Sequence, residues 1–552
     1  MSNIFKNKMK KRGAVLLAVA LIVSQLAACS KSKSGQEGTN NPKQTAVTNF
    51  NPSGMPIVKV PITLKMFTVR SQAHDDWNKL MVWSEYERIS GIHVQWEQVT
   101  QQQVKEKRNI LLASGDLPDA FFKQDFTSAE LLNYGSQGTF IKLNDMIDKY
   151  GGNIKAGFTN YPTSKKSIKM TDGNIYSLPF INDDLAGNIT NKLWINKKWM
   201  DDLGLKAPTT TDELYKVLKE IKEKDPNHNG KADEIAISTP GGNGTVAGFE
   251  GVLQILLGSW GLQNRGNQHR NVDVDESTKK LRFIPTTPQY REVLEYAAKL
   301  YADKLLDQDI FTITNPQFAA KHDQGVIGAF PYINHAFSQK HMDEYVGLDA
   351  LKGPHGDQLC SSVNDVVKAI GTFTITKNNK YPEETLRWVD YFYSDEGSRL
   401  FYMGVKDKTY TVSASGDYDY LPEIRKNPNG LMFNQSIGQY LCWSGDNNPA
   451  IKFMKYSKGG TYYPVNEDVT KRLKPYLPKE IWPVFSFTLE ENDRLLTLAN
   501  DMNSYRDEMI AKFVTGRTPF SEWDNYVASF KKMGLEEYMK IYQSAYERYQ
   551  KQ

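Results

Sequence analysis

A regular alternation of strand-like and helix-like segments near the start of the folded chain most constrains its fold. Residues 62–67 alternate apolar and polar side chains, which is typical of a strand, and residues 77–90 follow a helical pattern. Residues 92–96 have the pattern of a second strand, and residues 102–114 that of a second helix, which ends at Gly115. This β-α-β-α order predicts an α/β lobe in which helices pack on a sheet.

The length of the chain predicts more than one such lobe. A single hydrophobic core stops growing at roughly 250–300 residues, and this chain has 552. A second lobe is expected to open near Trp194. We find no internal repeat and no heptad pattern. The spacing of Thr210 and Glu213 is that of a capping box, and an apolar stripe of one helix follows it, formed by Leu214, Val217, Leu218 and Ile221. Further helices are predicted at residues 287–303, 382–393, 485–513 and 520–550.

Aromatic side chains make up 12% of the sequence, with 10 Trp and 29 Tyr. They have two possible roles that composition does not separate. They could be ordinary core and surface residues, or some could line a cleft that stacks on flat apolar faces such as sugar rings.

The N-terminus has the pattern of a bacterial lipoprotein signal peptide. Basic residues 6–12 precede an apolar run at residues 14–23, which is shorter than the roughly 20 residues that span a bilayer. Residues 26–29 (LAAC) resemble a lipobox, which implies a diacylglyceryl thioether on Cys29, further acylation of palmitate type and cleavage before it. The alternative is a plain secretory signal followed by a chance cysteine.

Residues 1–28 are therefore expected to be removed, and residues 29–56 to form a flexible tether rich in Ser, Lys, Gly and Asn. Removing the five cations of the signal segment from the formal charge of +4 leaves about −1, which argues against nucleic-acid binding. Two further cysteines, Cys360 and Cys442, could pair outside the cell, but such low cysteine use indicates a fold that does not depend on a disulfide.

Residues 225–234 (DPNHNGKADE) carry the most specific chemistry in the sequence. Oxygen-bearing side chains fall at positions 1, 3, 5, 9 and 10 of this segment, and Gly230 permits a sharp turn. The loop departs from the EF-hand pattern because Ala236 stands where a bidentate Glu is expected, so Glu234 would have to supply those oxygens. The alternative is a polar turn held by side-chain-to-backbone hydrogen bonds. The predicted structural calcium ligands are Asp225, Asn227, Asn229, the Lys231 carbonyl, Asp233 and Glu234.

Motifs spread over residues 60–550 resemble family-one extracellular solute-binding proteins, in particular the large carbohydrate-binding lipoproteins of Gram-positive ABC importers, which are related to alginate-binding proteins. The order of the motifs carries the resemblance more than any single one. They are residues 115–119 (GDLPD), 193–199 (LWINKKW), 203–205, 208–210, 394–397 (SDEG), 402–405 (YMGV), 513–516 (FVTG), 526–527 and 534–535, with Trp523.

The resemblance implies a two-lobed α/β fold of the periplasmic-binding-protein type II, with a hinge and a cleft between the lobes, and a calcium site in the loop at 225–234. It also implies a monomer that binds a carbohydrate and hands it to the transmembrane subunits of a permease, without catalysis. The lipid anchor would hold the chain on the extracellular face of the cell membrane. Expected boundaries are lobe 1 at 57–190 with a return segment at 366–420, lobe 2 at 191–365, and a C-terminal helical segment at 421–552 packing mainly on lobe 2.

Cleft residues are expected just after apolar runs, where strands end. A sugar site needs amides and acids for hydroxyl groups and an aromatic ring for the sugar face. Each aromatic candidate could instead belong to the core, and Asp125 could simply cap a helix. The ligand candidates are Gln124, Asp125, Trp260, Tyr332, Asn334, Trp443 and Asp446.

Other functions remain open at this point. The same fold could bind a peptide or a polyol, or present its ligand to a signalling partner. A surface glycosidase is a further alternative, but Asp183 and Asp184 are adjacent in one segment, as solvated loop residues often are.

Overall fold

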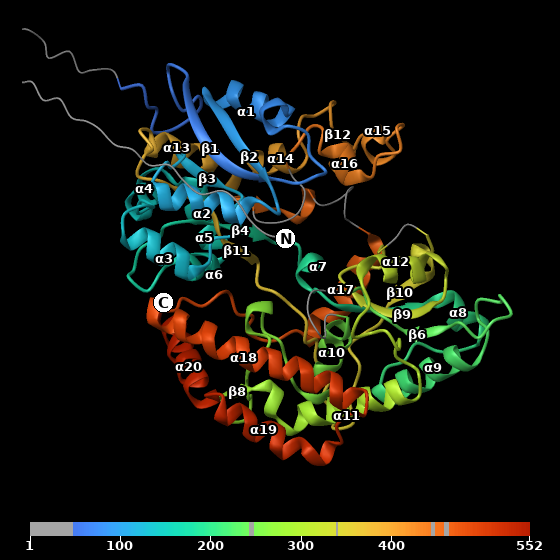
Figure 1. The fold of residues 1–552 in the computed structure, drawn as a ribbon. Coiled ribbons are helices and arrows are strands. Elements are labelled where there is room, and N and C mark those ends of the chain that lie inside the picture. The colour runs from blue at the N-terminus through green and yellow to red at the C-terminus, as the bar shows by residue number, and fades with distance from the viewer. Residues whose placement is uncertain (1–47, 242–247, 338–339, 443–447, 457–462) are drawn as a thin grey trace, which may run out of the picture. The chain divides into compact units, whose positions relative to one another are not determined.

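The computed structural model describes residues 48–241, 248–337, 340–442, 448–456 and 463–552 (Figure 1). Residues Asn49–Gln552 form one compact unit. Within the described ranges, every helix is too short or too polar to cross a bilayer.

The first sheet is mixed and has the strand order β14-β4-β11-β3-β1-β2. Strands β2 and β3 both pair in parallel with β1, whereas β11 is antiparallel to its neighbours β3 and β4. Its strands are β1 (Ile62–Arg70), β2 (Ile92–Thr100), β3 (Ala120–Phe122), β4 (Leu178–Asn182), β11 (Val367–Ile375) and β14 (Ile451–Lys452).

The second sheet has the order β10-β5-β9-β6. Strand β5 is antiparallel to both of its neighbours, and β6 is parallel to β9. Its strands are β5 (Lys192–Asn196), β6 (Ile235–Ile237), β9 (Ile327–Tyr332) and β10 (Tyr345–Gly347), and two hairpins stand apart from both sheets, β7 (Val272–Val274) with β8 (Leu281–Phe283) and β12 (Tyr410–Val412) with β13 (Tyr418–Tyr420).

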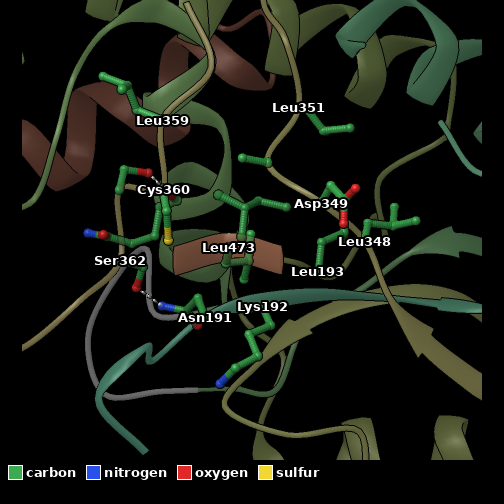
Figure 2. A pocket seen from close by; sticks show the side chains of 14 residues that line it. Asn191, Lys192, Leu193, Leu348, Asp349, Leu351, Leu359, Cys360, Ser362 and Leu473 are labelled. Atoms are coloured by element: carbon green, nitrogen blue, oxygen red, sulfur yellow. Dashed lines mark hydrogen bonds between the residues drawn. The ribbon is translucent and has the colours of Figure 1, made fainter. Parts of the chain in front are cut away.

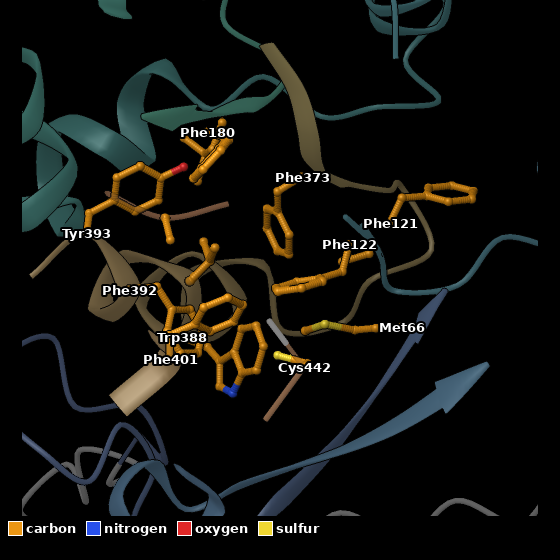
Figure 3. Packing of buried hydrophobic residues seen from close by; sticks show 14 of the residues in the cluster. Met66, Phe121, Phe122, Phe180, Phe373, Trp388, Phe392, Tyr393, Phe401 and Cys442 are labelled. Carbon is orange, nitrogen blue, oxygen red and sulfur yellow. The ribbon is translucent and has the colours of Figure 1, made fainter. Parts of the chain in front are cut away.

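The first sheet is covered by helices whose apolar faces build a core rich in aromatic rings (Figure 3). The Trp83 ring lies 4.7 Å from Trp96 and 5.8 Å from Trp388, centroid to centroid, and Phe122 packs against all three. The helices are α1 (Met81–Ser90), α2 (Val104–Ser114), α3 (Ser128–Ser136), α4 (Asn144–Tyr150), α5 (Gly152–Asn160), α6 (Pro162–Ile168), α13 (Pro382–Asp390), α14 (Asp395–Tyr402), α15 (Pro422–Arg425) and α16 (Phe433–Ile437).

The expected boundary at residue 421 differs from the structure. Ile424, Ile437 and Leu441 are buried in the first core, and β14 pairs with β4 of the first sheet. The Ser398 hydroxyl also donates to the Ile451 carbonyl of β14. Residues 422–442 and 448–456 therefore pack on the first sheet, because short apolar segments there complete its core and its edge.

A second core lies around helices from two distant parts of the chain. Helices α18, α19 and α20, drawn in orange to red, lie beside α11 and the β8 strand (Figure 1). Its helices are α8 (Lys197–Asp202), α9 (Thr211–Glu223), α10 (Phe249–Leu257), α11 (Pro288–Ala302), α18 (Leu489–Val514), α19 (Trp523–Lys532) and α20 (Leu535–Lys551), while α12 (Asn315–Asp323) and α17 (Pro464–Leu473) belong to a smaller core on the second sheet.

A buried histidine joins α20 to this second core. The His269 Nε2 donates to the Pro483 carbonyl oxygen over 2.7 Å, so Nδ1 accepts from the Tyr542 hydroxyl over 2.8 Å. Burial lowers the pKa of His269 to about 4, since a charged imidazolium would lose its hydration there.

Stability is expected to fall as the pH drops from about 6.5 towards 4, the usual pKa of histidine being about 6.5. In this window the unfolded chain binds a proton at His269 and the folded chain does not. At about 1.4 kcal/mol per pKa unit, the full loss is about 3 kcal/mol. Chemical denaturation of the wild type and of His269→Gln at pH 7.5 and 4.5 measures it, and an equal acid loss in both would contradict the assignment.

Candidate ligand and metal sites

The loop at 225–234 connects α9 to β6 and turns sharply on two left-handed residues. His228 has φ of 55° and Gly230 of 73°. The Asp225 carboxylate accepts hydrogen bonds from the backbone N–H groups of Asn229 (3.1 Å) and Gly230 (2.9 Å). The Asn227 Oδ1 also accepts from the Asn229 N–H (3.0 Å), which is the side-chain-to-backbone bond of an Asx turn.

Asp233 is also satisfied within the loop. The side-chain amides of Asn227 and Asn229 donate to its carboxylate at 3.0–3.3 Å. These hydrogen bonds, that of Asn229 first, lower the pKa of Asp233. The loop therefore gathers the oxygen-bearing side chains that the sequence singled out.

A simple polar turn does not explain the burial of the Glu234 carboxylate. The Glu234 side chain is fully buried, and neither carboxylate oxygen has a hydrogen-bond partner among the described residues. The nearby Lys222 amine donates to the Glu234 backbone carbonyl (2.6 Å). Burial raises the pKa of Glu234, because a carboxylate deprived of water and of partners is costly.

A divalent cation would supply the missing compensation, so the residues of the loop fit calcium. Ca²⁺ is bound by carboxylate, amide and backbone oxygens, of which the loop has all three kinds. Among the described residues, no three His, Cys, Asp or Glu side chains gather as a metal-binding group. The asparagine and carbonyl oxygens would therefore have to supply part of the coordination.

The two predicted ligand residues after β3 lie in different surroundings. Gln124 is 2% exposed; its side-chain Nε2 donates to the Phe122 carbonyl (3.1 Å), while its Oε1 has no partner among the described residues. Asp125 is exposed, and partial desolvation raises the pKa of its carboxyl group. The two side chains are adjacent in sequence but differ in access to solvent.

Trp260 was expected to stack on a ligand, and here the structure requires a correction. The side chain is 3% exposed and belongs to the second core. Its ring packs 5.4 Å from Tyr296, and its Nε1 donates to Glu292 (3.1 Å). Trp260 is thus a core residue, because the apolar run before it forms a buried helix, α10.

Tyr332 and Asn334 lie at and just beyond the end of β9, where the sequence predicted cleft residues, and both are partly buried. The Tyr332 ring packs edge-to-face on Phe337 at 5.1 Å, and the Asn334 amide oxygen accepts from the Ala336 N–H. Trp443, Asp446 and Cys29, the residue at which the sequence predicts lipidation, lie outside the described residues.

A small cavity beside β5 is excluded as a sugar site by its size (Figure 2). It has a volume of about 30 Å³, which suits water rather than a sugar ring. Lys192 borders it, but its amine donates to the carbonyls of Ala186, Ile189 and Ile333 at 2.7–2.8 Å. Cys360, which also lines this cavity, and Cys442 are buried free thiols in different cores.

A larger pocket of about 270 Å³ lies between helix α17 and the segment containing α7 (Leu185–Asn188). Asn466 and Thr470 of α17 face it, and Tyr463 lies at its edge as the N-cap of α17. Sequence analysis did not identify this pocket. The available signal was the spacing of Asn466 and Thr470, four residues apart on one helix face.

A model of the bacterial extracellular solute-binding protein family matches residues 75–399, which is more than half of the chain. The chain belongs to this family. The solute-binding protein is also 30% identical over 568 residues to the fructooligosaccharide ABC transporter substrate-binding protein FusA of Streptococcus pneumoniae, with 99% of each chain covered.

Two solved structures of FusA resemble this solute-binding protein. FusA in complex with kestose has a TM-score of 0.72 at 28% identity, and covers 89% of this chain and 99% of its own. An EF-hand mutant of FusA in complex with fructo-nystose has a TM-score of 0.71 at 29% identity, with the same coverage. The family and the α/β solute-binding fold predicted from the sequence motifs are thus confirmed.

Proposed function

We propose that this solute-binding protein captures an oligosaccharide of the fructooligosaccharide type outside the cell and delivers it to the permease of an ABC importer. The observation that carries this proposal is the match to FusA over 99% of both chains. A relationship that spans the whole length includes both sheets and the C-terminal helices, not only a shared domain.

The mechanism proposed for capture is closure of two lobes around the sugar. Lobe 1 would be built on the first sheet, residues 57–190 with 366–456, and lobe 2 on the second, residues 191–365 with 463–552. A sugar that contacts both lobes binds the closed form more tightly and shifts the equilibrium towards it. The closed monomer then presents its cargo to the transmembrane subunits.

Lipidation at Cys29 would anchor the protein to the extracellular face of the membrane. The support is the LAAC sequence at residues 26–29, directly after an apolar run. Each buried methylene of an acyl chain contributes about 0.8 kcal/mol, so two or more chains give stable attachment. Residues 30–48 would then act as a tether. The expected end of the tether at residue 56 is corrected, because residues 49–56 belong to the compact unit and Arg387 donates to the carbonyls of Asn51 and Gly54.

A structural calcium ion is proposed in the loop at 225–234. The buried carboxylate of Glu234, for which the described residues offer no hydrogen-bond partner, supports it, as does the existence of an EF-hand mutant of FusA. When bound, the ion would compensate the negative charge that the loop buries. The proposed ligands are Asp225, Asn227, Asn229, the Lys231 carbonyl, Asp233 and Glu234.

Of the ligand residues predicted from the sequence, we retain Gln124, Asp125, Tyr332 and Asn334. Each offers a hydroxyl, amide or carboxyl group after a strand of one of the two sheets. Trp443 and Asp446 also remain proposals from the sequence. Trp260 is withdrawn because the second core buries it.

Kestose and nystose are expected to raise the melting temperature of the purified protein. A ligand at a hundredfold excess over its Kd adds about 2.7 kcal/mol to the free energy of unfolding. The measurement is a thermal shift assay over a panel of fructooligosaccharides, oligogalacturonides, peptides and polyols, with product analysis by chromatography.

The panel separates the alternatives. A shift with peptides or polyols but not with sugars would replace the proposed cargo, and release of shorter sugars would indicate a glycosidase. A protein stabilised by none of the sugars would contradict the proposal. Bovine serum albumin in the same sugar solutions controls for nonspecific stabilisation by the solutes.

A further inference from the structure

Helix α17 has two faces of opposite character. Val469 and Leu473 are buried in the core of the second sheet, and Gly347 of β10 lies against Val469. Asn466 and Thr470 are equally well buried, yet they face the pocket of about 270 Å³. One face therefore fixes the helix to the sheet, and the other forms the wall of a cavity.

The Asn466 amide is the feature that marks this cavity as a binding site. The side chain is 7% exposed, and its Oδ1 has no hydrogen-bond partner among the described residues. The neighbouring Thr470 hydroxyl, in contrast, donates to the Asn466 backbone carbonyl at 2.6 Å. A buried polar atom without a partner is unfavourable unless a ligand supplies one.

The rest of the lining suits the two faces of a sugar ring. Tyr463 is half-buried and held by edge-to-face packing on His335, with 4.9 Å between the ring centroids. Leu185, Ala186 and Met454 add apolar surface. A pyranose or furanose ring has apolar C–H faces that pack on such surfaces and a rim of hydroxyl groups that bind amides.

Charge in the pocket favours a neutral ligand over a uronic acid. Glu467 lies 3.2 Å from the Lys471 amine, and its charge is thereby paired. Asp184 accepts from the Ala186 N–H as the cap of α7. The lining contains two acids, Asp184 and Glu467, and two lysines, Lys471 and the exposed Lys474, so its formal charges balance.

We propose that the pocket between α7 and α17 is a subsite for one neutral sugar unit of the bound oligosaccharide, with the Asn466 amide hydrogen-bonded to a ring hydroxyl and Tyr463 packed on the ring. The proposal rests on the proposed function, since it assigns part of the same cargo. A volume of about 270 Å³ is just below that of ligand pockets, which span about 300–1,000 Å³, so the pocket takes a single unit of a longer chain.

Replacing Asn466 by leucine separates an effect on sugar binding from an effect on folding. The change is expected to weaken sugar binding but not to lower the stability of the folded protein. The variant keeps about the same side-chain volume but removes the amide, whose Oδ1 has no partner among the described residues. We expect kestose or nystose to bind at least tenfold more weakly in isothermal titration calorimetry, while the melting temperature without sugar stays equal or rises. Asn525→Leu, the same change at an exposed position of α19, is the matched control.

Tyr463 provides a second, independent variant in case Asn466→Leu folds poorly. Tyr463→Phe keeps the ring and is expected to bind the sugar within threefold of the wild type, whereas Tyr463→Ala is expected to bind at least tenfold more weakly. Wild-type affinity in both Asn466→Leu and Tyr463→Ala would overturn the subsite and leave the proposed function intact. A wild-type protein that binds no fructooligosaccharide would overturn both. Binding of digalacturonate that is lost in Asn466→Leu would overturn the assignment of a neutral ring.

Discussion

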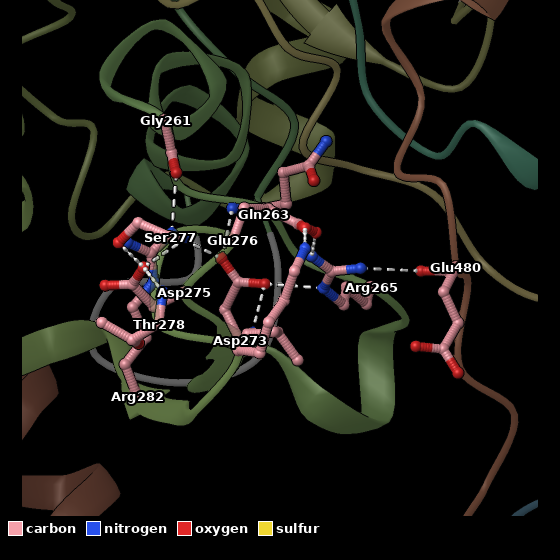
Figure 4. Close-up of polar contacts among 12 residues, drawn as sticks. Gly261, Gln263, Arg265, Asp273, Asp275, Glu276, Ser277, Thr278, Arg282 and Glu480 are labelled. Carbon is pink, nitrogen blue, oxygen red and sulfur yellow. Dashed lines mark hydrogen bonds and ion pairs between the residues drawn. The ribbon is translucent and has the colours of Figure 1, made fainter. Parts of the chain in front are cut away.

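Replacing Asp273 by alanine is expected to lower the free energy of unfolding by about 3–5 kcal/mol, because removing one partner of a buried ion pair leaves the other charge uncompensated. Asp273 is 1% exposed and lies between two arginines (Figure 4). Its carboxylate binds Arg265 Nε at 2.7 Å and Arg282 Nη2 at 2.8 Å. It also accepts from the Gln263 N–H.

The effect is expected to be global, since this network links segments far apart in the chain. Asp273 and Arg282 are opposite each other in the hairpin of β7 and β8. Arg265 donates in addition to the Glu480 carbonyl, and its guanidinium lies over the Trp482 ring at 5.6 Å. The hairpin is thereby tied to the segment that leads into α18.

The comparison for this prediction is Glu276→Ala. Glu276 also pairs with Arg265, at 2.6 Å, but its side chain is half exposed. Hydrogen bonds from Lys279 and then Arg265 lower its pKa to about 2, yet an exposed ion pair contributes only about 0–1 kcal/mol because water and salt screen it. Guanidinium denaturation of both variants measures the difference. Equal, small losses in the free energy of unfolding would show that the buried Asp273 contributes no more stability than the exposed Glu276.

Removing calcium is expected to lower the melting temperature by several degrees. A ligand present at a thousandfold excess over its Kd stabilises the folded state by about 4 kcal/mol. The expected cause is the Glu234 carboxylate, fully buried and without a hydrogen-bond partner in the described part of the chain. Differential scanning calorimetry with calcium and with excess chelator measures the change.

Glu234→Gln distinguishes a metal site from a polar turn. The variant is expected to melt at the same temperature with calcium and with chelator, because it lacks the buried carboxylate that the ion would compensate, while Asp225 and Asp233 are already hydrogen-bonded within the loop. Without calcium it should be as stable as the wild type or more so, since an amide is less costly to bury than an unpaired carboxylate. Glu223→Gln, an exposed change at the end of α9, should keep the calcium response. A wild type insensitive to chelator would argue for the turn alone.

Much of the local structure was predictable from the sequence, because it depends on neighbours a few residues apart. Strand β1 begins at residue 62 as its alternation predicts, and α1 and α2 end at Gly91 and Gly115, whose φ values of 77° and 76° suit glycine. The stripe of Leu214, Val217, Leu218 and Ile221 is buried as its helical spacing predicts.

The start of helix α9 differs in one detail from the capping box that the sequence indicated. The spacing of Thr210 and Glu213 indicated a capping box, and the Thr210 hydroxyl does accept from the Glu213 N–H. The Glu213 carboxylate, however, binds the N–H and hydroxyl of Thr209, one residue earlier. Spacing identified the helix start, whereas the rotamer of the glutamate determined its partner.

The sequence by itself therefore determined the first two strands, several of the helices, the family and the composition of the loop at 225–234, since each depends on residues close together in the chain or on the order of motifs. Tertiary structure alone decided that Trp260 is a core residue and that residues 422–442 and 448–456 complete the first core. It also decided that Asn466 and Glu234 carry buried oxygens that have no partner in the described part of the chain. Burial and the lack of a partner depend on which distant segments pack around a side chain. The spacing of residues within one segment does not specify those distant neighbours.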